Sequence, residues 1–181
     1  MKTVQKRLYA YIIDYIAGSI FISVLPMIIT SIITQQKAFT IEAFISMPLR
    51  WQVVSAALAT GAAVGYFIIY PMNPRHLGQT LGKQAVKIRV EAADGDGLTY
   101  GHMLRRELVG SMLIEGETAF PSAFFRYFLY QLFPPGAASL LPTAALVISI
   151  GSILWAVFGK NHRMIHDYVG GTVVRSSLDF L

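Results

Sequence analysis

Two groups of ionisable residues near the ends of the sequence are of the types that bind protons or ions. Arg7 precedes Asp14 by seven residues, so on a helix both lie on one face, two turns and about 10 Å apart. That distance is too long for a direct ion pair, but both side chains would point at the same neighbours. Near the C-terminus, His162 and His166 share a helical face and Asp167 follows directly. Asp14 is either a helix-end charge at the lipid headgroups or a buried acceptor that requires a cation or donors.

Metal and nucleotide binding are the alternatives for these residues. A structural metal site takes three or four convergent ligands, and the C-terminal histidines and aspartate have no further ligand nearby, so we expect no metal. The segment Gly78–Lys83 resembles a phosphate-binding loop, which needs four residues between its glycines and Ser or Thr after its lysine. Here three residues separate the glycines and Gln84 follows, so we expect a sharp backbone turn with Lys83 at the lipid phosphates.

The composition indicates that these residues belong to a membrane protein. Of 181 residues, 54% are hydrophobic and only 14% are charged, whereas soluble domains carry about 25% charged residues. The chain has no cysteine, which excludes disulfides, thiolate metal centres and iron–sulfur ligation. The formal net charge of +5 fits basic loops beside anionic lipids; the basic residues are too few and too scattered for a nucleic-acid surface.

Three long stretches carry no charge: 15–34, 51–74 and 127–159, the last interrupted by Pro134 and Pro135. A helix of about 20 residues crosses the bilayer, so we expect spans at 8–33, 53–70 and 138–158. The first is too long for the apolar region of a signal peptide, about 7–15 residues, and we expect it to be retained.

A fourth crossing follows from the distribution of positive charge. Basic residues gather at the N-terminus, in residues 71–106 and in the tail after Phe158, so all three are expected in the cytoplasm. The chain must then cross once more, at about 108–133. That segment is a poor span because Glu115, Glu117 and Arg126 interrupt it, and each charge costs roughly 2.5–3.5 kcal/mol at mid-bilayer. Four crossings are favoured and three remain the alternative, in a cell inner membrane with both termini cytoplasmic.

The cytoplasmic segment 71–106 has a different pattern. Apolar and charged residues alternate over 86–91, which predicts a strand, and Asp94–Gly97 predicts a turn. Residues 98–100 would be the returning strand of a small β-hairpin. From His102 a helical pattern begins with Leu104, Leu108 and Met112 on one stripe and Arg105, Arg106 and Glu107 opposite, which predicts an amphipathic interfacial helix.

Two further sets of residues suggest contact surfaces. Gly61 and Gly65 form a small-xxx-small pattern that permits close helix packing. Phe124, Phe125 and Phe128 belong to an aromatic cluster that lies at the membrane interface or contacts a partner protein. The fold class expected is therefore an all-α membrane bundle of about four helices, with a β-hairpin and an interfacial helix, in one domain over residues 1–181.

Four ordered motifs extend from about Lys6 to Val174: Arg7 with Ala10 and Ile13-Asp14; Gly78-x-Thr80-Leu81-Gly82-Lys83 with Lys87-Ile88-Arg89-Val90 and the Asp-Gly turn; Arg105-Arg106; and His166-Asp167 with Gly171–Val174. Together they resemble the RDD family of bacterial and archaeal membrane proteins, named for one arginine and two aspartates. About sixty residues separate Arg105 from His166, more than is usual in that family. The resemblance implies a polytopic protein of largely undefined activity, with transport, including sodium/proton exchange, proposed for some members and roles in membrane complexes for others.

Two functions remain open. In a transporter of an ion or small solute, Asp14 would be the acceptor, Arg7 and Arg105 its charge partners, and Asp167 a second carboxylate; four spans would then require a homo-oligomer. In an accessory or regulatory subunit of a larger membrane complex, the same charges, with His166 and Lys83, would form a structural clasp. No catalytic constellation or cofactor motif is present, so we expect neither an enzyme nor a cofactor. Both functions depend on whether Arg7, Asp14 and Asp167 converge.

Overall fold

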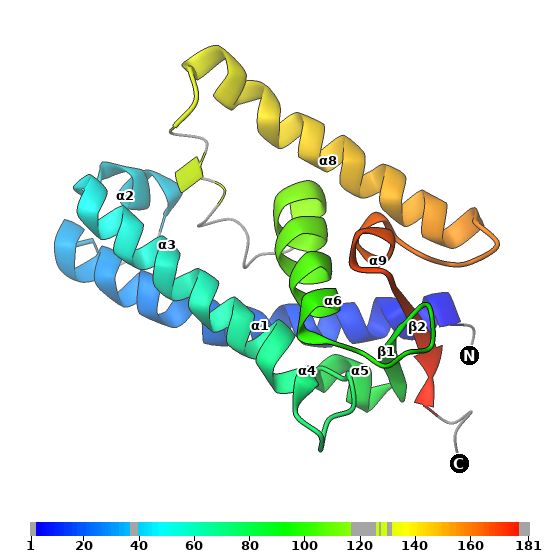
Figure 1. The fold of residues 1–181 in the computed structure, drawn as a ribbon. Coiled ribbons are helices and arrows are strands. Elements are labelled where there is room, and N and C mark those ends of the chain that lie inside the picture. Colours follow the sequence, from blue (N-terminus) through cyan, green and yellow to red (C-terminus); the bar gives the residue numbers. More distant parts are fainter. Residues whose placement is uncertain (1–2, 37–39, 117–125, 127, 130–131, 178–181) are drawn as a thin grey trace.

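The computed structural model describes residues 3–36, 40–116, 126, 128–129 and 132–177 (Figure 1). Three of its helices are long and apolar enough to cross a membrane, as predicted. The first is α1 (Thr3–Thr34). The second is a continuous rod, Leu49–Met72, made of α3 (Leu49–Val64), η1 (Gly65–Ile69) and α4 (Tyr70–Met72). The third is α8 (Pro135–Phe158).

The first two spans lie side by side as a helical hairpin (Figure 1). The short helix α2 (Ile41–Ser46) joins them and begins at Thr40, whose hydroxyl accepts a hydrogen bond from the Ala43 amide at 3.1 Å. Small residues of α3 keep the hairpin narrow, since Ala59 and Ala63 are buried against Ile22 of α1. The core of the hairpin is completed by Phe44, Met47 and Met112.

Close helix contacts within the chain are made at glycines other than Gly61 and Gly65. A Cβ added at Gly61 or Gly65 would meet nothing within 4 Å among the described residues, so their predicted role in helix packing is not seen within this part of the chain and stays a prediction. The crowded positions are Gly82, where a Cβ would overlap the backbone of α1, and Gly110, where it would lie 2.6 Å from the Cα of His166. Glycine at these two places lets neighbouring backbones approach where a side chain would separate them.

A small sheet joins distant parts of the sequence. Strand β1 (Ile88–Ala92) pairs antiparallel with β2 (Thr172–Ser176), with Ile88 opposite Ser176 and Ala92 opposite Thr172. The predicted strand is therefore present, but its predicted hairpin partner, residues 98–100, is wrong. Thr99 instead caps α6 (Tyr100–Leu104), because its hydroxyl accepts from the His102 amide at 3.2 Å while the His102 ring accepts from the Thr99 amide.

The helix that begins at α6 continues as η2 (Arg105–Glu115), a π-helical segment. It is not the interfacial helix that was predicted, because Arg106 and Glu115 are buried while Leu104, on the predicted apolar stripe, is 41% exposed. It packs between α8 and α9 (Ile165–Gly170), which follows the last span. The inward face of α8 is formed by small residues: Ala145, Ser149, Ser152 and Ala156 are all buried.

One end of the molecule collects the start of α1, the end of α4, α5 (Leu81–Ala85), the sheet, α9 and the end of α8 (Figure 1). The other end holds α2 and the start of α8. Pro135, at the start of α8, therefore lies at that second end. Part of the weak span predicted at 108–133, including Phe124 and Phe125, lies outside the described residues, and Phe128 is half-buried.

The packing of α5 on α1 generates a stability prediction. Gly82→Ala places a methyl group against the Ala10 carbonyl oxygen and 2.8 Å from the Asp14 carboxyl carbon, so it should separate α5 from α1 and cost at least about 1–3 kcal/mol. We expect a lower melting temperature in detergent, measured by scanning fluorimetry. Gly61→Ala is the matched control: it meets open space and should leave the melting temperature unchanged or slightly raised. Equal melting temperatures for the two variants would refute this packing.

Candidate functional site

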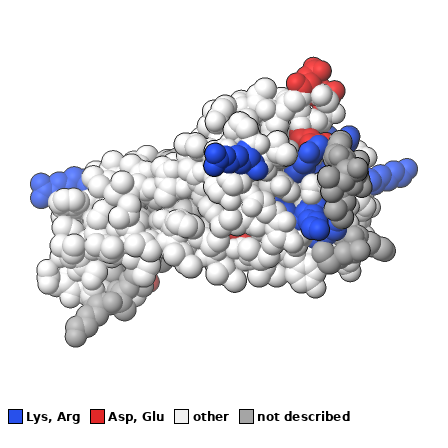
Figure 2. Space-filling view, turned by 90° about the horizontal axis from the view of Figure 1, so that it is seen from below, with Lys and Arg blue, Asp and Glu red and all other residues white. Residues whose placement is uncertain are grey.

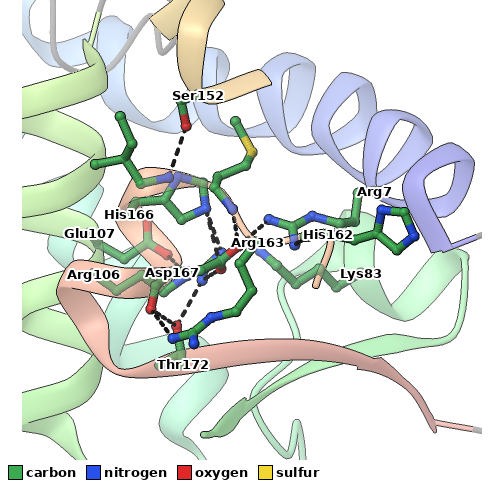
Figure 3. Close-up of polar contacts among 12 residues, drawn as sticks. Arg7, Lys83, Arg106, Glu107, Ser152, His162, Arg163, His166, Asp167 and Thr172 are labelled. Atoms are coloured by element: carbon green, nitrogen blue, oxygen red, sulfur yellow. Dashed lines mark hydrogen bonds and ion pairs between the residues drawn. The ribbon is translucent and has the colours of Figure 1, made fainter. Parts of the chain in front are cut away.

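The side chain of Asp167 is fully buried between two arginines from distant helices (Figure 3). Arg7 of α1 donates from Nη2 to Asp167 Oδ2 at 2.6 Å, and Arg106 of η2 donates from Nη1 to Oδ1. The Met164 backbone amide also donates to Oδ2, at 2.8 Å. One carboxylate therefore ties the first span, η2 and the C-terminal helix α9 to each other.

The charges of this cluster hold one another ionised. Burial alone would raise the pKa of the Asp167 carboxyl, but the positive charges of Arg106 and Arg7 and the hydrogen bond from the Met164 amide outweigh burial and hold this pKa well below its usual range. Burial would lower the pKa of Arg106, but the carboxylates of Asp167 and Glu107 outweigh it and raise that pKa. Arg106 Nε donates to Glu107 at 2.9 Å, so two carboxylates share the guanidinium. The pair is thus charged on both sides despite its burial.

His166 links this pair to a second buried carboxylate. Arg106 Nη2 lies 2.9 Å from His166 Nε2, and because a guanidinium can only donate, Nε2 must accept. The ring proton then sits on Nδ1, 2.5 Å from Glu115 Oε2, to which it is donated. His166 is therefore held as the neutral Nδ1–H tautomer. Both of its ring nitrogens are engaged in these hydrogen bonds. Among the residues that the structure describes, no group of three His, Asp or Glu is placed to bind a metal ion.

Glu115 fastens the last span to the rest of the molecule. Its Oε1 accepts from Ser152 Oγ of α8 at 2.5 Å and from the His166 backbone amide at 2.9 Å. Its backbone carbonyl accepts from Ser149, one turn earlier on α8. One of the charges that make residues 108–133 a poor span, Glu115, is therefore the group that holds α8 against η2 and α9.

Asp14 lies in a separate, adjoining cluster on the inner side of α1. Its Oδ1 accepts from the Tyr66 hydroxyl at 2.7 Å and the Gly82 amide at 2.8 Å, and its Oδ2 accepts from Thr80 at 2.5 Å. Lys83 Nζ lies 3.8 Å from Oδ2, and burial lowers the pKa of this lysine although Asp14 opposes that effect. Asp14 is thus a buried acceptor and not a helix-end charge at the surface.

The predicted convergence of Arg7, Asp14 and Asp167 holds for one pair only. Arg7 contacts Asp167, whereas Asp14 shares no hydrogen-bond partner with either residue. Both clusters nevertheless lie at the same end of one cavity, because Arg7 and Asp14 line it together with Lys83, Arg106 and Glu115.

Arg105 does not have the predicted role. Its side chain is exposed, and the buried partner of Asp167 is the next residue, Arg106. The sequence also gave no role to Tyr66, Thr80 or Thr172. Spacing alone could not have identified these three, since each is a common residue in an ordinary position whose partner lies far away in the chain.

The cavity has a volume of about 380 Å³ and is bounded by α1, η1, η2, α8 and α9. Its polar end carries three cations and three carboxylates: Arg7, Lys83, Arg106, Asp14, Glu107 and Glu115. The remaining wall is mainly apolar, with Val64, Phe67, Leu108, Ile153 and Val157 among its residues.

The chain matches the RDD family over residues 2–171, nearly its whole length. It belongs to the RDD family. Comparison with curated proteins and with solved structures gives no match. In this RDD protein the arginine near the N-terminus and the aspartate near the C-terminus form one ion pair, while the first aspartate binds a tyrosine, a threonine and a backbone amide.

The Asp167 cluster predicts a large effect of removing one charge. Asp167→Asn leaves two arginines facing each other without their shared anion, and breaking a buried pair in this way costs about 3–5 kcal/mol. We expect strongly reduced folded yield and melting temperature, measured by fluorescence-detected gel filtration. Asp94→Asn, in an exposed turn, is the matched control and should behave as wild type. A stable Asp167→Asn protein would show that the ion pair is dispensable.

The lowered pKa of Asp167 also predicts a pH dependence. A carboxyl whose pKa is lower in the folded than in the unfolded state stabilises fully above its ordinary pKa of about 3.9, and the contribution is lost as pH falls. The melting temperature of wild type should therefore fall between about pH 5 and pH 3. The melting temperature of Asp167→Asn, measured on the folded fraction obtained, should fall less steeply with decreasing pH than that of wild type. The melting temperature of Asp94→Asn should fall as steeply as that of wild type. Parallel curves for all three proteins would contradict this assignment.

Proposed function

We propose that this RDD protein transports an ion or small solute and that the cavity beside Asp14 and Lys83 is its binding site. The observation that carries the proposal is the cavity of about 380 Å³ between the spans, whose polar end has three cations and three carboxylates. Ionisable side chains at membrane depth are costly and mark solute or ion pathways. The volume falls in the range of about 300–1,000 Å³ typical of small-molecule sites.

The proposed setting is a cell inner membrane, with the end that carries the sheet in the cytoplasm. On the face in Figure 2 most of the basic atoms lie toward that end, and one basic side chain marks the opposite end. Lys and Arg are favoured on the cytoplasmic side of spans. In this proposal both termini are cytoplasmic, and the chain crosses a fourth time at about 108–133, as the distribution of positive charge predicts. A pathway through so few helices is proposed to require a homo-oligomer.

A second function, an accessory subunit of a larger membrane complex, is favoured by a different observation. The carboxylates of Asp14, Glu115 and Asp167 are each bound by at least three donors from within the chain. Groups so fully engaged can serve as a structural clasp that shapes a surface for another protein. In that case the charges would carry no solute.

Flux through proteoliposomes distinguishes the two functions. Vesicles containing the protein are loaded with a pH-sensitive dye or assayed with labelled sodium, and transport predicts proton or sodium flux above that of empty vesicles. Asp14→Asn should reduce flux at least about tenfold, because it removes the charge at the polar end of the cavity. Asp96→Asn, in the exposed turn, is the control and should retain flux. Folded protein without flux, recovered together with a stoichiometric partner in mild detergent, would favour the accessory role instead.

A further inference from the structure

The cavity opens onto the apolar outer surface of two spans. Its rim includes Leu8 and Tyr15 of α1 and Ile153 and Val157 of α8, which line the cavity and are also 41–57% exposed. Outward-facing apolar residues of membrane spans lie against lipid chains. The mouth of the cavity therefore faces the hydrocarbon layer sideways, and an acyl chain can reach the interior from the bilayer without passing through water.

The polar end of the cavity has unused hydrogen-bond donors. Lys83 Nζ has three hydrogens but donates one hydrogen bond within the described part of the chain, to Thr80 at 3.2 Å, since Asp14 at 3.8 Å is beyond hydrogen-bond distance. Arg7 uses Nη1 and Nη2, for His162 O and Asp167, and its Nε has no partner among the described residues. Both side chains are only 14% exposed, so water satisfies little of this capacity.

The acceptors on the same wall are largely used. Both oxygens of Asp14 and both oxygens of Glu115 accept hydrogen bonds from the chain. Only Glu107 keeps a carboxylate oxygen without a donor among the residues described, because Arg106 binds the other one. The formal charges of the lining residues balance, so net charge does not select the ligand. The excess of hydrogen-bond donors does, and it favours an anionic group that accepts hydrogen bonds from Lys83.

We propose that the cavity binds a single-chain amphiphile with an anionic head, the head at Lys83 and Arg7 and the chain along Phe67, Leu108 and Ile153. The inference rests on the cavity being the functional site proposed above, and it names the class of small solute held there. A volume of about 380 Å³ is near the lower limit for small-molecule sites, which suits one acyl chain. Phosphate and carboxylate heads share the required chemistry.

The head, not the chain, should decide the affinity. Lipid chains are as apolar as the cavity wall, so transfer of an acyl chain from the bilayer into the cavity brings no hydrophobic gain. A hydrogen bond from a buried ammonium to an anion is strong, and losing it should weaken binding at least about tenfold. Amphiphiles of equal chain length and different head charge therefore separate binding in the cavity from simple partition into lipid.

The experiment uses the full chain in phosphatidylcholine nanodiscs and a dodecyl phosphate that carries a diazirine near the end of its chain. After photolysis we expect cross-links to the segments around Phe67, Leu108 and Ile153, mapped by mass spectrometry. Excess dodecyl phosphate or dodecanoate should suppress labelling, and their relative potencies identify the preferred head. Dodecyltrimethylammonium and dodecanol should not suppress it. Equal suppression by the cationic or the neutral competitor would overturn the assignment of an anionic head.

Two matched pairs of variants locate the site. Lys83→Met should raise the dodecyl phosphate concentration needed for half-suppression at least about tenfold, while Lys87→Met, an exposed lysine, should leave it unchanged. Val64→Phe fills the cavity without changing charge and should abolish labelling, so the test survives if Lys83→Met does not fold. Val147→Phe, on the exposed face of α8, should label as wild type. Undiminished labelling of Val64→Phe refutes the proposal.

This assay is independent of flux. Saturable labelling without proton or sodium flux would leave the amphiphile site in place and reject ion transport. Ion flux with no saturable labelling would support ion transport and reject the amphiphile site. The failure of either proposal is thus recognised separately.

Discussion

The fold depends on a single buried anion that must be shared by two arginines. A carboxylate removed from water is tolerable only when cations and donors surround it, and Asp167 obtains them from α1, η2 and its own helix. Arg7 and Asp167 are 160 residues apart, so neutralising this charge brings together the two ends of the chain. The β1–β2 sheet then closes over the same end, since β2 begins two residues after α9 ends.

The other buried carboxylates repeat this logic at neighbouring joints. Asp14 fixes α1 to η1 and α5, and Glu115 fixes η2 to α8 and α9. Hydrogen bonds of this kind require short backbone separations, which explains the crowded glycines: Gly82 of α5 packs against α1 beside Asp14, and Gly110 of η2 packs against α9 at His166. Helices in lipid gain little from apolar contact with each other, so polar joints and small residues have to provide the specificity.

The sequence predicts the parts of this structure that depend on local patterns and fails where a distant partner decides. Three spans are evident because length and apolarity are local properties, and strand β1 follows from its alternation. Alternation with a period of two indicates a strand but does not say which segment pairs with that strand, so β2, some 80 residues away, could not be inferred. The local pattern places Arg106 opposite the apolar stripe, whereas α9 packs on η2 and buries Arg106 against Asp167, a partner that no local pattern reveals. Hydropathy scales treat Glu115 only as an unfavourable charge in a span, because they assign each charged residue a transfer free energy without considering its partners.

The same polar joints that hold the bundle together also explain why it encloses a cavity. Glu115 and His166 attach α8 to η2 and α9, so the last span is held through these elements and its residues face α1 across the space between them. Helices joined only by apolar packing would close until their side chains interlocked, whereas here the carboxylate contacts fix the spacing. Because those contacts engage most of the acceptors but leave hydrogens of Lys83 and Arg7 without a partner among the described residues, the enclosed space has a donor-rich end and an apolar wall. A cluster serving stability alone would gain from further acceptors for these largely buried side chains, since an unmade hydrogen bond inside a protein is costly.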